Sequence, residues 1–387
     1  MNDADLNEDD LAAVAAAKDF AAGYLSRHCR QWESDREMPR EMFLEAARAG
    51  LCGLLVRPGQ GGRGIGINAF LRVMEELSYV DMAAAFALVV HNNHARFIDS
   101  VGTANLIGRY LPRMIAGEII GAFLLTEPQG GSDAAAISTS AVADGRGYIL
   151  NGEKAWVSNS THAGLLNVFA QTDPAAGARG IASFQVPADT PGVTRLPAYE
   201  MLGGYATGAG GFRFENVRVG SEQLLVPAGQ GFKAAMAGID LARACVAAMC
   251  VGLLRAGLDT AMPRLLRRHA FGRPLAEQQG LQWQLVDVAT DLRASRLLAY
   301  DAARLIEQGG SAPEAAAHAK KFAATAAFSG LNICMQAMGA DGLKQEFPLA
   351  RHLAAAKMAQ YIDGTMEIQN LVISRALQKA YTGGQVS

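Results

Sequence analysis

The sequence lacks the residue patterns that would indicate a disulfide framework, a metal site or a membrane span. Its five cysteines are odd in number and scattered, with no C-x-x-C pair, which argues against a disulfide framework or a zinc site. The seven histidines show no H-E-x-x-H or other ligand spacing, so we expect no metal. No run reaches the roughly 18 uninterrupted apolar residues of a membrane helix, so we expect no membrane span.

Strong charge of either sign is also missing. The formal net charge is −2, so no broad basic field would attract nucleic acid or an anionic membrane. The first residues, MNDADLNEDD, are acidic where a secretory signal would be basic and then apolar. Together with the scattered thiols, this predicts a protein of the reducing cytoplasm.

What the chain does have is length and apolar residues arranged in three zones. With 387 residues, half of them apolar, it can form two or three compact units. Helical spacing dominates residues 1–120, strand-like and turn-rich patterns fill 121–230, and helical spacing returns over 231–387. The fold class is therefore α+β, with a helical domain, a β domain and a second helical domain in that order.

Local patterns predict several element boundaries. Asn68 is expected to cap the helix NAFLRVMEELSYV, and Ser311 to Glu314 reads as a capping box with a helix-starting proline. Asn151-Gly152 lies between two short β-like runs and predicts a hairpin turn. In GFRFENVRV the aromatic and aliphatic residues alternate at strand period, with Glu215-Asn216 as an expected bulge.

Four segments carry chemical groups, and each also has a plain structural interpretation. GQGGRG fits a flexible loop better than a phosphate cradle, because no second buried strand follows. LLTEPQGGSD is either an ordinary loop or a site that hydrogen-bonds a planar heterocycle. AWVSN places Trp156 and Ser158 on one strand face, and Arg268 in RRHAFGRPLAEQQ could meet a phosphate or mark a solvated helix end. In AQYIDGTMEIQ, Asp363 beside Gly364 is either a helix cap or a reactive carboxylate.

Taken together, these segments resemble the acyl-CoA dehydrogenase flavoprotein family over essentially the whole chain. TEPQGGSD, NGEKAWVSN, RHAFGRPLAEQQ, QAMGADGL and YIDGTMEIQ resemble that family's T-E-P-x-x-G-S-D, N-G-x-K-x-W-[IV]-[ST]-N, R-x-x-F-G-x-x-[IL]-x-x-x-Q, Q-x-x-G-G-x-G and Y-E-G-T-x-[ED]-I-Q motifs, in the same order. The resemblance implies an N-terminal helical domain, a middle β-barrel or sandwich domain and a C-terminal four-helix bundle.

The resemblance also implies an FAD site between the β domain and the C-terminal helices, completed by a neighbouring subunit. Thr126 would bond the pyrimidine edge of the flavin, Trp156 would pack on its ring and Ser158 would bond near N5. The residues implied for FAD are Phe123, Leu125, Thr126, Ser132, Trp156, Ser158, Arg268, Phe271, Gln279, Gln336, Gly339, Thr365 and Glu367. Those implied for the acyl-CoA substrate are Ser132, Asp240, Arg243 and Gly364. Ala340 replaces a glycine of the family pattern, which crowds that contact.

By the same resemblance Asp363 is the catalytic base that removes the α-proton of an acyl thioester. The family usually has Glu there, and the shorter Asp places its oxygens roughly 1.5 Å short unless backbone or substrate moves. The alternative base position on the earlier helix holds Ala242. The helix expected to border the acyl tail carries His91, Asn92, Asn93 and His94, so some of these should face outward and the acyl pocket should be polar or short. The run DMAAAFAL lacks the arginine of members that bind dicarboxylic acyl groups, which disfavours a glutaryl-type substrate.

Three functions remain open. The first is dehydrogenation of a short, branched or alicyclic acyl-CoA, for example cyclohexanecarboxyl-CoA, with an electron-transfer flavoprotein as the acceptor and a homotetramer as the assembly. The second is a nitroalkane-oxidase-like enzyme, which also uses Asp but carries an arginine where this chain has Asn370. The third is action on a carrier-protein-bound acyl group, or structural binding of FAD with little turnover.

Overall fold

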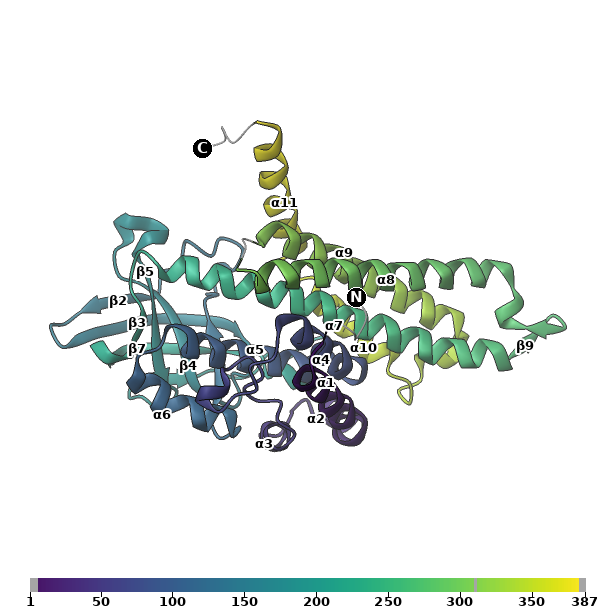
Figure 1. The fold of residues 1–387 in the computed structure, drawn as a ribbon, viewed down its shortest axis with the longest axis horizontal. Coiled ribbons are helices and arrows are strands. Elements are labelled where there is room, and N and C mark those ends of the chain that lie inside the picture. Colours follow the sequence, from purple (N-terminus) through teal and green to yellow (C-terminus); the bar gives the residue numbers. More distant parts are fainter. Residues whose placement is uncertain (1–5, 310–311, 383–387) are drawn as a thin grey trace.

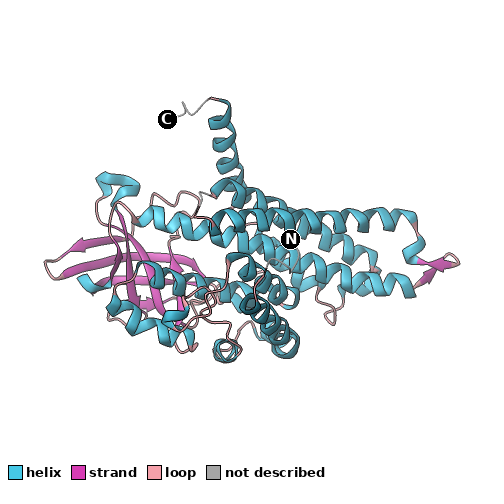
Figure 2. Ribbon diagram, viewed as in Figure 1, coloured by secondary structure: helices cyan, strands magenta, loops and turns pink. Residues whose placement is uncertain are grey.

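Helices form both terminal parts of the chain and strands form its middle (Figure 2). The computed structural model describes residues 6–309 and 312–382. The first part comprises α1 (Glu8–Phe20), the π-helix η2 (Ala21–Leu25), α2 (Ser26–Asp35), α3 (Glu41–Arg48), α4 (Ile67–Val80), α5 (Met82–Val101) and α6 (Ala104–Ile115). The strands are β1 (Ile120–Leu124), β2 (Ser140–Ala143), β3 (Gly147–Val157), β4 (Ala163–Gln171), β5 (Ile181–Pro187), β6 (Val193–Arg195), β7 (Gly210–Gly220) and β8 (Leu224–Val226). The last part comprises α7 (Gly231–Arg267), the hairpin of β9 (His269–Ala270) and β10 (Arg273–Pro274), α8 (Gln279–Glu307), α9 (Pro313–Ala337), α10 (Leu349–Ala359) and α11 (Met366–Tyr381).

 The order of helices, then strands, then helices confirms the predicted α+β fold class.

The strands form one eight-stranded sheet at one end of the molecule (Figure 1). The strand order is β6-β7-β3-β2-β4-β5-β8, and β1 pairs in parallel with β4. Phe212, Phe214, Val217 and Val219 of β7 are all buried, as their alternation predicted. The long helices α7, α8 and α9 extend from the sheet toward the opposite end, where β9 and β10 form the tip (Figure 1).

The predicted hairpin at Asn151-Gly152 is wrong, because β3 runs straight through both residues. The β2–β3 connection lies earlier, where Asp144 Oδ1 accepts the backbone N–H groups of Arg146 and Gly147. Asn151 Oδ1 instead accepts the N–H of Asn216 at 2.8 Å, within the bulge of β7. The bulge predicted at Glu215-Asn216 is therefore confirmed, and it supplies the non-local partner that makes Asn151 a strand residue.

Two predicted helix starts differ from the structure. Helix α4 begins at Ile67 after Gly66, so Asn68 is not its cap, and the Asn68 side chain donates to Glu307 at 3.0 Å. Helix α9 begins at Pro313, as the helix-starting proline predicted, but Ala312 precedes it without a side-chain cap. Ser311 lies outside the described residues.

Three of the four polar residues of α5 face the protein interior, so the expectation that they line an acyl pocket is wrong for them. Asn92 Oδ1 accepts the N–H groups of Gly53 and Leu54, and its amide donates to Leu51 and Leu88. His91 contacts the carbonyl of Met114 at 3.1 Å, and His94 contacts Gln185 Oε1 at 2.8 Å. These residues bind the turn that follows α3, the end of α6 and strand β5, whereas Asn93 is half-buried.

Helix α7 is the central helix of the C-terminal part. It is long and apolar enough to cross a membrane, but 78% of its apolar window of 18 residues is buried in the structure, as in a core helix. Its Arg255 forms ion pairs with Glu75 and Glu76 of α4, and Glu75 also binds Arg296 of α8 at 2.6 Å. This partly buried cluster joins the N-terminal helices to the bundle.

We predict that Asn92→Ala lowers the free energy of unfolding by about 2–5 kcal/mol, because it leaves two buried backbone N–H groups without acceptors. Urea denaturation checks this prediction. Asn105→Ala, at an exposed position of α6, is the matched control and should change the stability by less than about 0.5 kcal/mol. Equal stabilities of the two variants would show that the Asn92 contacts do not hold the fold.

Candidate active site

The Asp363-Gly364 turn joins α10 to α11 and holds a buried carboxyl group. Asp363 has φ 53°, a left-handed conformation that costs an ordinary residue about 1 kcal/mol. Gly364 has φ 92°, and a Cβ there would lie 3.1 Å from Gln369 Nε2 and 3.3 Å from Arg243 Nη2. Glycine at position 364 is therefore favoured by its positive φ, and a Cβ would require these neighbouring side chains to shift. The Asp363 side chain is not a helix cap, because α11 begins after Thr365.

Two cations bind the carbonyl oxygens of this turn. Arg243 Nε donates to Asp363 O at 3.0 Å, and Arg243 Nη1 donates to Asp240 Oδ1 at 2.9 Å. Lys320 of α9, which is fully buried, donates to Gly364 O at 2.8 Å and to Gln360 O at 3.1 Å. Both cations thus hold the backbone of the turn, and neither forms an ion pair with the Asp363 carboxylate within the described chain.

The environment of Asp363 makes its carboxyl group a weak acid. Burial raises its pKa to about 6, against the opposing effect of Lys320 and Arg243. Its Oδ2 is buried and has no hydrogen-bond partner in the part of the chain that the structure describes. A buried carboxylate with a free oxygen is poised to take a proton from a bound molecule near neutral pH.

Lys320 is a site residue that the sequence interpretation missed. Burial lowers the pKa of its ammonium group to about 8, so the group remains largely protonated at neutral pH. One signal was present in the sequence: Lys320 shares a face of α9 with Ala316, Ala319 and Ala323, all buried. A lysine on an alanine face is unusual unless its charge has buried acceptors.

A second part of the site is the loop that follows β1, which contains Leu125, Thr126 and Ser132. Thr126 is half-buried and its carbonyl accepts the N–H of Ala155, so the loop lies directly beside β3. The Phe123 ring packs against Phe169 in a tilted arrangement with ring centroids 4.9 Å apart, and Ser132 is exposed.

The loop is held by a buried ion pair that the sequence interpretation also missed. Lys154 Nζ donates to Glu127 Oε1 at 2.7 Å and to Leu125 O at 3.0 Å. Glu127 also accepts the N–H groups of Ser138 and Thr139. Although burial raises the pKa of Glu127, Lys154 and these hydrogen bonds lower it to about 2, so the carboxylate is ionised. The pair ties both ends of the loop to β3.

Trp156, at the end of β3, offers an exposed aromatic surface beside this loop. Its side chain is 62% exposed and its φ is 55°, a rare conformation for a bulky residue. The ring packs against Tyr199 with centroids 4.4 Å apart. Ser158 follows in the turn after the strand and is half-buried, so the prediction that both residues lie on one strand face is wrong.

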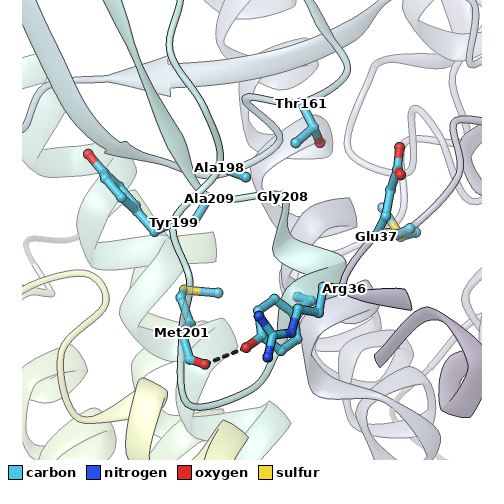
Figure 3. Close-up of a pocket in the computed structure, with 10 residues that line it drawn as sticks. Arg36, Glu37, Thr161, Ala198, Tyr199, Met201, Gly208 and Ala209 are labelled. Carbon is cyan, nitrogen blue, oxygen red and sulfur yellow. Dashed lines mark hydrogen bonds between the residues drawn. The ribbon is translucent and has the colours of Figure 1, made fainter. Parts of the chain in front are cut away.

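The hollow drawn in Figure 3 is separate from the Asp363 turn. It lies between the end of α2 and the loop 198–209, and its lining includes Arg36, Thr161 and Tyr205. Tyr199, which lines it, is also the residue that packs on Trp156. None of the residues around the Asp363 carboxyl lines this hollow, so it is not the reaction centre.

The predicted site residues form two groups at opposite ends of α7. The first group lies where α7 meets the sheet and the Asp363 turn; it consists of Phe123, Leu125, Thr126, Ser132, Trp156, Ser158, Asp240, Arg243, Asp363, Gly364, Thr365 and Glu367. The second group lies at the tip of the bundle, beside β9; it consists of Arg268, Phe271, Gln279, Gln336 and Gly339 (Figure 1). Arg243 and Arg268 are 25 residues apart on and just past one helix, about 37 Å along its axis. One copy of the chain therefore does not bring the two groups together.

The second group is assembled on its own and faces outward. Arg264 of α7 forms an ion pair with Asp341 and donates to Met338 O, so the end of α9 lies beside the end of α7. Phe271 is 96% exposed with φ 54°, and Arg268, Gln279 and Gln336 are exposed. An aromatic ring held in solvent by a strained backbone indicates a binding surface.

We predict that Lys154→Met lowers the free energy of unfolding by about 3–5 kcal/mol, because it leaves the buried Glu127 carboxylate without its cation. Arg213→Met is the matched control, since Arg213 pairs with Glu153 at an exposed site of the same sheet. Its cost should be about 0–1 kcal/mol. Chemical denaturation of both variants checks this, and equal costs would contradict the assigned role of the buried pair.

Comparisons with known proteins agree with this geometry. Family models match residues 7–118 as the acyl-CoA dehydrogenase N-terminal domain, 122–217 as the middle domain and 229–378 as the C-terminal domain. The short-chain specific acyl-CoA dehydrogenase of Bos taurus is 34% identical over 94% of this chain and 89% of its own.

Solved structures share the fold over nearly the full length. One, described as an electron transferring flavoprotein of Acidaminococcus fermentans, has a TM-score of 0.93 at 34% identity and covers 96% of this chain and 98% of its own. A glutaryl-CoA dehydrogenase from Mycobacterium smegmatis in complex with FADH2 has a TM-score of 0.91 at 29% identity and covers 97% and 96%. The exposed Trp156 ring and the clamped loop beside it fit a flat cofactor of this kind. The chain belongs to the acyl-CoA dehydrogenase family of FAD-dependent oxidoreductases.

Proposed function

We propose that this enzyme removes hydrogen from the α and β carbons of a short, branched or alicyclic acyl-CoA, such as a cyclohexanecarboxyl thioester, with Asp363 as the base. The observation that carries the proposal is the buried Asp363 carboxyl, whose Oδ2 lacks a partner and whose pKa is raised, by burial first, to about 6. A base of this kind is ionised at neutral pH and is still a better proton acceptor than an exposed aspartate. Likeness to a short-chain specific dehydrogenase supports a short acyl group.

The residues of the turn position the proton transfer. Arg243 and Lys320 fix the carbonyls of Asp363 and Gly364, which sets the place of the carboxylate despite its short side chain. The N–H of Asp363 donates to no backbone carbonyl of the described chain, so it is free to donate to the thioester oxygen as charge develops there. The α-proton passes to the Asp363 carboxylate, and the bond between the α and β carbons becomes double as the β-hydrogen leaves with its electron pair. Bound FAD supplies the acceptor for that hydride.

We also propose that copies of the chain complete one another's FAD site within a homotetramer. Arg268 lies about 37 Å along the axis of α7 from Arg243, so we propose that the two groups contact different cofactors within one copy. The bundle also exposes large apolar side chains at helical spacing on α8, namely Trp283, Val286 and Leu297. Helix α11 projects from the bundle (Figure 1), with Gln369 as its one residue buried within the described chain. Such faces are usual at contacts between subunits.

Two further elements of the proposal concern the surroundings of the enzyme. An electron-transfer flavoprotein is the proposed electron acceptor, supported by the likeness to the Acidaminococcus fermentans structure. The proposed location is the cytoplasm, and the five cysteines, all within the described residues, are buried and unpaired, as a reducing compartment allows.

We predict that kcat/KM falls as the pH is lowered through about 6, because protonation of Asp363 removes the base. The pKa of this carboxyl is raised above the ordinary value, so the loss begins at a higher pH than an exposed aspartate would give. Initial rates measured between about pH 5 and pH 8 check the prediction. A rate that is constant across this range would argue against Asp363 as the base in the free enzyme.

We predict that an acyl-CoA of the proposed class bleaches the oxidised flavin band of the FAD-loaded enzyme in an anaerobic titration. Asp363→Ala should slow the bleaching by about 10²–10⁴-fold while the protein keeps its FAD. Asp189→Ala, an exposed carboxylate after β5, is the control and should behave as the wild type. The panel includes nitroethane and a carrier-protein-bound acyl group. Bleaching by nitroethane alone would replace the proposed function with the oxidase alternative, and bleaching by the carrier-bound group alone would move the substrate to a carrier protein.

A further inference from the structure

Helix α5 has one stripe of residues that is not fully buried. Val90, Asn93, Arg96 and Phe97 are half-buried, whereas the residues between them are buried. Their spacing of three and four places them on one face of the helix. This face is distinct from that of Asn92, whose amide is fully used by the backbone around it.

The stripe faces a matching stripe on α7. Phe97 packs in one apolar cluster with Phe232, Met236 and Ile239 of α7 and with Phe123 of β1. On α7 these residues and Asp240 are half-buried, and the helix from Leu241 to Cys250 is buried. We call the line where the two stripes meet the α5–α7 seam. It runs from the loop after β1 toward Arg243, which holds the Asp363 turn.

Arg96 is the one cation of these two stripes, and no carboxylate of the described chain forms an ion pair with it. The acid of the seam, Asp240, is bound to Arg243 at 2.9 Å. Burial lowers the pKa of the Arg96 guanidinium, because removal from water disfavours its charged form. One turn before it, the buried Oδ1 of Asn93 also lacks a partner. Unpaired polar groups at a seam that leads to a reactive carboxyl indicate a ligand that supplies their partners.

The packing of α5 on α7 places Arg96 near the Asp363 turn. Phe97, the next residue of α5, lies in one apolar cluster with Ile239, and Arg243, one turn further along α7, donates to Asp363 O at 3.0 Å. In agreement with this packing, the pKa of the Cys245 thiol is raised by burial first and also by the Asp363 carboxylate, and it is lowered by Arg96. The phosphates of CoA lie at the far end of its long, uncharged pantetheine arm. A counter-charge for Arg96 is thus expected on the acyl group, not on the nucleotide.

We infer that Arg96, assisted by Asn93, binds a carboxylate on the acyl group, so that the substrate is the mono-CoA thioester of a short dicarboxylic acid. This inference rests on the proposed dehydrogenation, and it replaces the neutral short acyl group proposed above with a short acyl group that carries a carboxylate. The guanidinium offers paired N–H donors that match a carboxylate. The sequence argument against a dicarboxylic substrate considered the run 81–88, and Arg96 lies beyond that run on the same helix.

The test is a binding comparison in an Asp363→Asn background, which prevents turnover. Calorimetry of the FAD-loaded protein compares succinyl-CoA with butyryl-CoA and glutaryl-CoA with pentanoyl-CoA, pairs that differ in the carboxylate alone. The carboxylated member of each pair should bind about tenfold to a hundredfold more tightly. Arg96→Met should abolish that preference and leave butyryl-CoA binding unchanged, and Arg96→Lys should retain part of it. Arg146→Met, in the exposed β2–β3 turn, is the matched control and should retain all of it.

Two results would overturn the inference. In the first, the carboxylated thioesters bind no more tightly than the neutral ones. In the second, Arg96→Met weakens succinyl-CoA, butyryl-CoA and free CoA alike, which would place Arg96 on the CoA moiety. Flavin bleaching in the enzyme with Asp363 intact separates this outcome from the proposed function. Bleaching by butyryl-CoA without a carboxylate preference keeps the dehydrogenase and removes the Arg96 site. A carboxylate preference without bleaching by any thioester keeps the site and removes the dehydrogenase.

Discussion

The reactive part of this enzyme depends on two buried cations that bind backbone carbonyls. Lys320 and Arg243 come from α9 and α7, and each donates to a carbonyl of the Asp363-Gly364 turn. The left-handed Asp363 costs about 1 kcal/mol, and each charge-assisted hydrogen bond contributes about 1.5–3 kcal/mol. The bonds therefore outweigh the strain. Because both cations bind carbonyls, they fix the carboxylate without neutralising it, and burial can still raise its pKa to about 6. A direct ion pair would hold the side chain equally well but would weaken the base.

Strained backbone conformations also occur at other residues that are proposed to contact the cofactor. Six non-glycine residues of the described chain have positive φ, and Trp156, Phe271 and Asp363 are three of them. Each is a residue that the motifs assigned to cofactor or chemistry, and two are aromatic rings that the chain leaves exposed. Packing of a folded chain does not require an exposed tryptophan in a left-handed conformation. Such a conformation persists when surrounding structure holds it, as the Lys154–Glu127 pair does at the neighbouring residues.

The sequence predicted the fold class and the family, because the motifs are short segments whose residues act together. It failed where a side chain has its partner far away in the chain. Asn151-Gly152 has the composition of a turn, but Asn151 binds a bulge 65 residues later. The polar run of α5 suggested a pocket, but Asn92 completes the backbone of residues about 40 positions earlier. Lys320 and Lys154 were missed for the same reason, since a buried lysine is recognisable from its acceptors and not from its neighbours in sequence.

The length of α7 adds a constraint that no motif contains. The N-terminal third of this helix carries Arg243 beside Asp363, the proposed base, and Arg268 directly follows its C-terminal end beside an exposed phenylalanine. If both groups serve the same cofactor, each cofactor must lie between two copies, and the distance between the groups fixes how far the copies overlap. The buried ion pairs of Arg255 in the middle of α7 keep the helix in place against α4 and α8. In the proposed assembly, a rigid helix of this length would couple assembly to catalysis, because a displaced partner would remove cofactor contacts without disturbing Asp363.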